Sequence, residues 1–526
     1  MSHSASASES WKPASNPWLV AMIVTLAVFM EILDTTIVNV ALPHIAGSLS
    51  SSYSESTWVL TSYLVANGIV LPISAFLSRV FGRKQYFLIC IVMFTVCSFL
   101  CGIATELWQI ILFRILQGFF GGGLQPVQQS VLLDYFKAED RGKAFGLASI
   151  AIIVAPIVGP TLGGWITDNY SWRWVFFINI PVGILTVLAI YPLLEDPPWE
   201  RKWAKGKLRI DYIGICFITL GLGCLQVMLD RGEDDDWFSS DFIRLFAVLT
   251  AIGLVGAVYW LLYARKPVVD LHCLKDRNFA VSCLLMAGMA MILYGSSVVL
   301  PQLAQQDLGY TATWSGLVLS PGAVLVVLTI PLVLQLMPRV QTRWIIAFGF
   351  TCLCVSMFYS ATLTPDVDFA TLTLMRSAQS LGLGFLFVPL TTIAFVSIPQ
   401  RLNADAAALF TMFRNVAGSI GISLSTAAIT DRAQARSAGL VHNMTPLHEP
   451  FNLTLERWAQ AIRDFTHALG DPLTLASGQL YKEMVAQARF LAYIDVFIGL
   501  GVVALLMIPF CLLLSPIKSQ GSPGAH

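Results

Sequence analysis

The stretch Arg114-Ile-Leu-Gln-Gly-Phe-Phe-Gly-Gly-Gly-Leu-Gln-Pro126 places one charge and two amides inside an otherwise apolar and glycine-rich segment. A second stretch, Arg376-Ser-Ala-Gln-Ser-Leu-Gly-Leu-Gly-Phe-Leu-Phe-Val-Pro389, follows the same plan late in the chain. Arginine and glutamine keep the same separation in both, and each stretch runs toward a proline. The repeat predicts two copies of one helical unit, and duplicated six-helix halves are a hallmark of one membrane architecture.

The composition agrees with a membrane protein. Of 526 residues, 56% are hydrophobic and only 12% are charged, and the mean hydropathy is +0.70. Soluble domains carry about twice that charged share, so lipid must cover much of the surface. The formal net charge is zero, which gives no reason to expect a nucleic-acid partner. No cofactor, metal site or nucleophile–base arrangement is visible, so an enzyme is a poor fit.

Apolar runs long enough to cross a bilayer recur fourteen times, which predicts an all-α polytopic membrane protein. Two of the runs fall between the halves and are extra to the duplicated twelve. The predicted spans are Trp18–Leu42, Thr57–Ser78, Tyr86–Ala104, Trp108–Leu133, Ala144–Ile166, Trp174–Leu194, Ile210–Leu229 (extra), Phe242–Tyr263 (extra), Phe279–Leu300, Thr313–Leu336, Trp344–Ala361, Ala370–Ile393, Ala406–Ile429 and Leu491–Leu514.

The predicted organisation is a disordered cytoplasmic tail, an N-terminal half, the extra spans with their loops, a C-terminal half and a second cytoplasmic tail. These parts cover residues 1–17, 18–194, 195–265, 266–514 and 515–526. Lysine and arginine crowd the loops on one side of the membrane, and the short loops on the other side hold only Arg173, Arg231 and Arg244. The asymmetry predicts that both termini are cytoplasmic.

One outer loop, residues 430–489, is long, polar and of mixed charge. It contains helical-looking pieces at Leu455–Ala468 and Ser477–Ala488. Loops of this length are usually functional, so we expect a docking surface. A loose tether remains the alternative.

Five charged residues lie well inside predicted spans, away from the span ends, where each costs roughly 2.5–3.5 kcal/mol on insertion scales and is functional by default. They are Glu31, Asp34, Arg114, Arg376 and Arg414. At ~1.5 Å per residue, Asp34 and Arg114 lie at similar depths below the outer ends of their helices, so they can pair. Glu31 lies on the same face as Asp34, about one turn deeper. A buried ion pair that only fixes helix register is the alternative.

Polar and small residues at helical spacing on the fourth span suit a water-filled cavity, and they equally suit close helix packing. On their own, the Gly118–Gly122 and Gly159–Gly163 pairs favour close helix packing. The proline cluster of the fifth span is expected to bend or loosen that helix. The residues that we expect to line a substrate cavity are Thr35, Asn39, Gln117, Gln125, Tyr294, Arg376 and Arg414.

Several motifs resemble the major facilitator superfamily, and within it the fourteen-span drug:proton antiporters of the EmrB/QacA group. The first span carries Leu33-Asp-Thr-Thr-Ile-Val-Asn-Val-Ala-Leu-Pro43, and the fourth carries Arg-x-x-Gln-Gly from Arg114. The likeness runs from about Trp18 to the C-terminus. In the fifth span, the residues that resemble the conformational antiporter motif are Gly146, Pro156, Gly159, Pro160, Gly163 and Gly164.

The resemblance implies proton-driven export of hydrophobic toxic compounds across a bacterial inner membrane, with Asp34 as the main proton-coupling residue, Arg114 tuning it and Glu31 assisting. It also implies two partners, a periplasmic adaptor of the EmrA type and a TolC-type outer-membrane channel. The alternatives are a stand-alone pump, an exporter of one metabolite, uptake by symport, and a non-transporting sensor. No soluble signalling domain is visible to support the sensor.

One loop departs from the family pattern Gly-x-Leu-x-Asp-Arg-x-Gly-Arg. This chain reads Ala75-Phe-Leu-Ser-Arg-Val-Phe-Gly-Arg83, so Arg79 occupies the acidic position. The cytoplasmic charge contact that the family forms through this acidic position therefore cannot form in its ordinary way. We therefore expect Arg79→Asp to shift the balance of conformations and not to abolish transport.

Overall fold

The computed structural model describes residues 13–197, 210–264, 267–442, 444–445, 448–465 and 471–516. Within these residues, fourteen helices are long and apolar enough to cross a membrane, which confirms the predicted number. The chain is thus a multi-pass membrane protein. Most of the two predicted tails lies outside the described residues.

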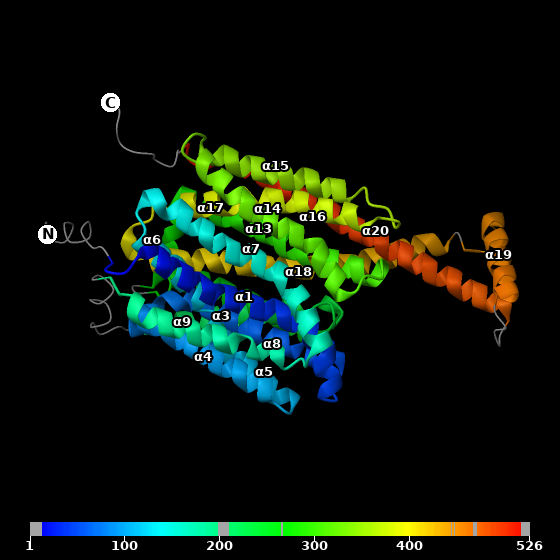
Figure 1. Cartoon of the computed structure of the whole chain (residues 1–526), viewed down its shortest axis with the longest axis horizontal. Coiled ribbons are helices and arrows are strands. Elements are labelled where there is room, and N and C mark those ends of the chain that lie inside the picture. Colours follow the sequence, from blue (N-terminus) through cyan, green and yellow to red (C-terminus); the bar gives the residue numbers. More distant parts are fainter. Residues whose placement is uncertain are drawn as a thin grey trace.

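The N-terminal half forms the lower part of Figure 1, in blue and cyan. Its fourth span is divided between two helices, and so is its sixth. Its helices are α1 (Pro17–Ser48), α2 (Tyr53–Ser56), α3 (Trp58–Phe81), α4 (Arg83–Ile103), α5 (Leu107–Gly121), α6 (Leu124–Tyr135), α7 (Ala138–Asn169), α8 (Trp174–Phe177) and α9 (Asn179–Leu193).

The C-terminal half lies above it in the same view, in green, yellow and red. Its helices are η2 (Leu271–Lys275), α13 (Arg277–Gln302), η3 (Leu303–Asp307), α14 (Ala312–Leu336), α15 (Thr342–Ser360), α16 (Phe369–Gly384), α17 (Phe387–Ala394), η4 (Gln400–Leu402), α18 (Asn403–Val441), α19 (Glu449–Phe465) and α20 (Pro472–Cys511). The pair α16 and α17 interrupts its span after the repeated arginine as α5 and α6 do, so the sequence repeat is also a structural one.

The two extra spans are α11 (Tyr212–Arg231) and α12 (Asp241–Tyr263), separated by η1 (Trp237–Ser239). They cross closely, because a Cβ added at Gly253 would lie 2.3 Å from the backbone nitrogen of Gly221. α11 also packs on α3 and reaches α18, where Ser423 Oγ donates to Leu229 O at 2.7 Å. The extra spans therefore touch both halves.

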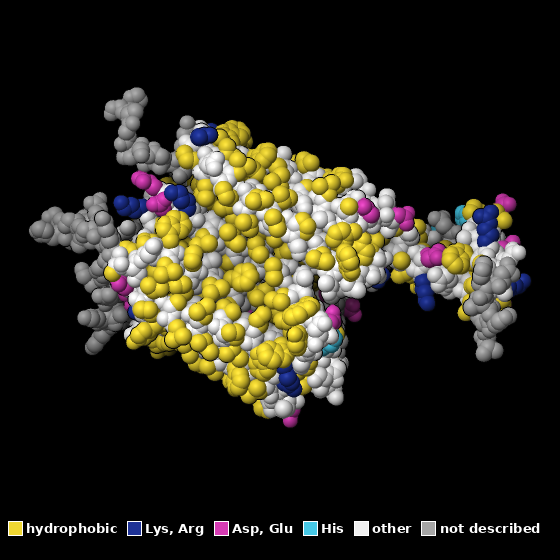
Figure 2. Space-filling model, in the orientation of Figure 1, with side chains coloured by type: hydrophobic (Ala, Val, Ile, Leu, Met, Phe, Trp, Pro, Cys, Tyr) yellow, Lys and Arg dark blue, Asp and Glu magenta, His cyan; other side chains and the backbone are white. Residues whose placement is uncertain are grey.

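The surface of the bundle separates by polarity. Figure 2 shows hydrophobic side chains over the visible flank, with the charged side chains at the two ends and on a projecting arm. Large apolar residues such as Leu188, Val255 and Leu328 are more than half exposed. This distribution suits lipid contact along the flank and water at the ends.

The predicted outer loop is mostly helical. α18 continues well past its predicted end to Val441, and α20 begins at Pro472. Arg436 pairs with Asp495 at 2.9 Å between these two helices, and α19 packs on α20. The 39 residues of α18 span ~58 Å, against about 30 Å of hydrocarbon. Figure 1 shows the resulting hairpin projecting from one end of the bundle, with α19 at its tip.

Candidate functional site

Among the described residues, the most buried ion pair lies between α1 and α5. Asp34 and Arg114 are both 0% exposed, and Arg114 Nη1 lies 2.5 Å from Asp34 Oδ2. Asp34 Oδ1 accepts hydrogen bonds from Gln117 Nε2 at 3.1 Å and from Asn179 Nδ2 at 2.6 Å. The expected pairing of these charges is present. The sequence analysis did not single out Asn179 of α9, although an amide side chain inside an apolar span could have indicated a functional residue.

Arg114 has further partners besides the carboxylate. Its Nε donates to Val59 O at 3.2 Å, and its Nη1 donates to Gln117 Oε1 at 3.0 Å. The guanidinium also lies 4.1 Å from the ring centroid of Tyr63, a cation–π distance. If Asp34 takes up a proton, Arg114 keeps these contacts. Neutralising the carboxyl therefore removes the counter-ion of Arg114 but leaves these neutral partners in place.

Glu31 lies one turn from Asp34 on α1 and has a different environment. Its carboxylate accepts from Tyr63 Oη at 3.2 Å, Asn67 Nδ2 at 3.0 Å and Gln125 Nε2 at 2.5 Å. All three donors are neutral. Among the described residues no cation contacts Glu31, so a proton on this carboxyl would not break an ion pair.

Gln125 connects this carboxylate to the other half of the molecule. While its amide nitrogen donates to Glu31, its oxygen accepts from Arg414 Nη2 of α18 and from Asn415 Nδ2 at 3.5 Å. Tyr294 lies beside this bridge, since a Cβ added at Gly418 would lie 2.5 Å from its ring. The hydrogen-bonded relay from Glu31 through Gln125 to Arg414 therefore crosses the interface between the halves.

Arg376 does not join this network. It is buried within the C-terminal half, and its partners are Ser296, Ser297 and Gln379. Thr35 is half-buried and donates to Glu31 O of its own helix at 3.1 Å, whereas Asn39 is exposed one turn further along. Four of the seven expected cavity residues thus lie at the two buried sites. Gln117 contacts the Asp34–Arg114 ion pair. Gln125 and Arg414 form the bridge from Glu31 to α18, and Tyr294 lies beside it.

The motif glycines of α7 lie at close helix contacts. A Cβ at Gly146 would lie 2.9 Å from Ile330 of α14, and one at Gly159 would lie 2.0 Å from Thr36 Oγ1 of α1. Gly163 approaches Ile37 in the same way. Gly164 is buried, and its carbonyl accepts from Thr167. These contacts favour the packing interpretation. Pro156 and Pro160 lie inside α7, which runs as one helix from Ala138 to Asn169.

The two halves meet firmly at the end where α1 begins, here named the closed end. Arg79 Nη1 pairs with Asp405 Oδ2 of α18 at 2.7 Å, and Arg79 Nη2 donates to Val268 O at 3.2 Å. Asn403 Nδ2 also donates to Asp134 Oδ1 at 2.9 Å. The sequence had suggested no partner for Arg79. The structure gives Arg79 an acidic partner, Asp405 of the C-terminal half. An ion pair therefore joins the two halves at this end, with its arginine on the N-terminal half.

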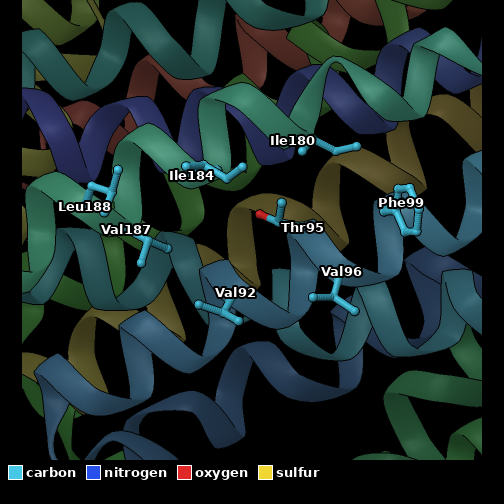
Figure 3. A pocket seen from close by; sticks show the side chains of 9 residues that line it. Val92, Thr95, Val96, Phe99, Ile180, Ile184, Val187 and Leu188 are labelled. Carbon is cyan, nitrogen blue, oxygen red and sulfur yellow. The ribbon is translucent and has the colours of Figure 1, made fainter.

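A groove on the lipid-facing side of α4 and α9 does not resemble a substrate site. Figure 3 shows its lining, which is aliphatic and aromatic apart from Thr95. The hydroxyl of Thr95 donates to Ile91 O at 2.7 Å within its own helix. The groove therefore has no free polar group to orient a ligand. The buried charges between the helices are the stronger candidate.

Comparisons with known proteins agree with this geometry. The model of the Major Facilitator Superfamily matches residues 24–422. The multidrug export protein EmrB of Escherichia coli (strain K12) is 37% identical over 489 residues, which cover 92% of this chain and 93% of that protein. The protein of the same name from Haemophilus influenzae is 40% identical over 429 residues, covering 81% and 83%.

A solved structure agrees in fold. A bacterial homolog of the human lysosomal transporter Spinster, inward-facing and unoccupied, aligns with a TM-score of 0.53 at 16% identity, over 97% of this chain and 99% of that one. At this identity the likeness concerns the fold alone. From the family model and the identities to both EmrB proteins, the chain belongs to the major facilitator superfamily and to its EmrB group of membrane transporters.

Proposed function

We propose that this protein is a proton-driven antiporter that exports hydrophobic toxic compounds across the bacterial inner membrane. The observation that carries the proposal is the Asp34–Arg114 pair, a buried carboxylate whose cation has other partners. Proton uptake by Asp34 removes the counter-ion of Arg114 and leaves that guanidinium with its neutral partners, Val59 O, Gln117 Oε1 and the Tyr63 ring. A substrate that favours the ionised pair would then displace the proton, and a proton would displace the substrate, with no covalent step.

In this mechanism Asp34 is the main proton-coupling group, Arg114 tunes it and Glu31 assists. Glu31 adds a link to the other half through Gln125 and Arg414. A change at α1 therefore reaches α18 directly, and α18 carries Asp405 of the closed end. Release of the proton and movement of the halves are coupled through contacts of this kind.

A transport assay in everted membrane vesicles tests the function. With an imposed pH gradient, the wild type should accumulate rhodamine 6G, a cation, or the neutral 1-pyrenebutanol. Asp34→Asn should insert normally and lose gradient-driven uptake. Asp241→Asn, at a highly exposed site on α12, is the matched control. Uptake of neither dye by the wild type, or full uptake by Asp34→Asn, would contradict the proposal.

We further propose that the pump works in a three-part assembly with a periplasmic adaptor of the EmrA type and a TolC-type outer-membrane channel. The hairpin of α18, α19 and α20 would be the docking surface, with both termini on the opposite, cytoplasmic side. It projects from the bundle (Figure 1) and exposes apolar side chains, including Leu453, Leu475 and Tyr481. Exposed apolar groups on a projecting element are typical of interaction sites.

Deleting residues 440–480 separates docking from transport. Membrane insertion should remain normal, cellular resistance should fall, and dye transport in vesicles should persist. Unchanged resistance would refute the docking role and favour a stand-alone pump. Loss of vesicle transport would place these residues in the transport machinery, which also contradicts a pure docking role.

A further inference from the structure

The segment that leads from the extra spans into the C-terminal half is buried at the closed end. It comprises residues 267–276, here named the connector, and it ends at Asp276, whose carboxylate caps α13 by accepting from Phe279 N at 2.8 Å. Val268 and Val269 are each 1% exposed, and Cys273 is 3% exposed. Connecting segments usually run over the surface, so a buried connector needs specific contacts for its backbone.

Asp211, at the start of α11, provides one of these contacts. Its Oδ1 accepts from Gly214 N at 2.9 Å and from Trp260 Nε1 of α12 at 2.8 Å, and its Oδ2 accepts from Val268 N at 3.1 Å. Capping of α11 needs only the bond from Gly214. The other two bonds fasten α12 and the connector to the first turn of α11.

The carbonyl of the same connector residue contacts the ion pair of the closed end. Val268 O accepts from Arg79 Nη2 at 3.2 Å, while Arg79 Nη1 pairs with Asp405 Oδ2 at 2.7 Å. A guanidinium is planar and its N–H groups form a rigid fork, so a contact at one terminal nitrogen fixes the direction of the other. Val268 therefore joins Asp211 on one side to the aim of Arg79 on the other.

The helix that begins at Asp211 is fixed against the helix that carries Arg79. A Cβ added at Gly223 of α11 would lie 3.2 Å from Ile69 of α3. At the far end of α11, Arg231 Nη1 donates to Thr57 Oγ1 at 2.7 Å, and its guanidinium lies 5.4 Å from the ring centroid of Trp58. Because α11 is held on α3 at both positions, Asp211 is a fixed point from which the connector can be placed.

We propose that Asp211 is a positioning residue, which directs Arg79 toward Asp405 through the backbone of Val268. The two extra spans thereby hold the closed end shut, a role that the duplicated twelve spans do not supply by themselves. The inference goes beyond the proposed export function, since it requires only that the closed end opens and closes. A purely structural role, in which Asp211 caps α11 and joins it to α12, is the alternative that the test must exclude.

The isosteric variant Asp211→Asn tests the proposal. It keeps Oδ1 for the cap and for Trp260, but it replaces Oδ2 by an amide nitrogen, which cannot accept from Val268 N. Membrane insertion should therefore remain normal. Ala408, 0% exposed beside Ala75, reports opening as Ala408→Cys in a full-length background without native cysteines.

Maleimide labelling of this cysteine, measured without substrate, should be roughly 2- to 10-fold faster in Asp211→Asn, the worth of one hydrogen bond. Trp260→Phe, which keeps a ring and loses the N–H, should change the rate in the same direction. Asp368→Asn, at the N-cap of α16 on the opposite end, is the matched control and should label at the original rate. An unchanged rate in Asp211→Asn would overturn the proposal.

A double-variant comparison separates positioning from a structural role. In an Arg79→Ala background, Asp211→Asn should no longer accelerate labelling, because the side chain that it positions is absent. Asn403→Ala, which removes the separate contact with Asp134, should accelerate labelling in both backgrounds and shows that Arg79→Ala alone has not opened the end fully. If Asp211→Asn accelerates labelling by the same factor with and without Arg79, Asp211 acts by another route and the proposal fails.

Discussion

The ion pair between Arg79 and Asp405 gives the sharpest prediction about conformation. It joins α3 of one half to α18 of the other, and its side chains are 14% and 4% exposed. Coulomb's law gives about 4 kcal/mol for unit charges ~4 Å apart at an effective dielectric constant of ~20. Partial exposure and side-chain entropy reduce this to about 1–3 kcal/mol.

Arg79→Asp replaces that attraction by repulsion between two carboxylates. Contact at the closed end should weaken by at least the same energy, so the share of molecules open at this end should rise about 5- to 150-fold. Activity should change in rate and not vanish, because the proton-coupling groups are untouched. The double variant Arg79→Asp/Asp405→Arg restores an opposite pair and should bring the equilibrium back.

Cysteine labelling measures this equilibrium. Ala408 of α18 is fully buried beside Ala75 of α3 at the closed end, so Ala408→Cys in a background without native cysteines reports opening. Maleimide labelling should accelerate in Arg79→Asp and slow again in the swapped double variant. Lys143→Asp, in an exposed pair, is the control. If the swap labels as fast as the single variant, the pair does not hold this end closed.

Three further predictions concern the buried sites. Gly159→Ala should lower the free energy of unfolding by about 1–3 kcal/mol, because the added Cβ would lie 2.0 Å from Thr36 Oγ1. Gly439→Ala, with open space around it, should leave stability unchanged. Equal unfolding midpoints for the two variants would contradict the packing role of Gly159. Asn179→Leu removes the 2.6 Å hydrogen bond that Asn179 Nδ2 donates to Asp34 Oδ1, and it should impair proton-driven uptake. Asn169→Leu, at an exposed helix end, is the control and should impair uptake less. Equal uptake by the two variants would exclude Asn179 from the site. Arg114→Gln should move the pH optimum of any remaining transport upward, since loss of the cation favours the neutral carboxyl; a downward shift in the pH profile would contradict the pairing.

The sequence predicted the features that a single helix or a repeat encodes. Fourteen spans follow from hydropathy, and the Asp34–Arg114 pair follows from two rare charges at matching depths. The helical extent of the hairpin was underestimated, because hydropathy marks where lipid ends and not where a helix ends. α18 continues into water with polar residues that still favour a helix.

Contacts between helices that are far apart in the chain could not be predicted from one sequence. Asn179, Tyr63 and Asn67 are polar residues within apolar spans, and nothing local indicates which of them meets a carboxylate. Asp405 lies at the start of α18, far in sequence from Arg79, and only the tertiary fold brings the two together. Likewise, only the fold shows that Arg376 donates to Ser296, Ser297 and Gln379 and that no carboxylate among the described residues pairs with it.

The central claim is that Asp34 exchanges a proton with the substrate, and proton release from purified protein in a weakly buffered detergent solution tests it most directly. Addition of rhodamine 6G or 1-pyrenebutanol should release protons from the wild type and from the control Asp241→Asn. Asp34→Asn should bind the probe yet release far fewer protons, and Glu31→Gln should lose a smaller part. Release from Asp34→Asn equal to that of the wild type would contradict the account and assign the proton to another group.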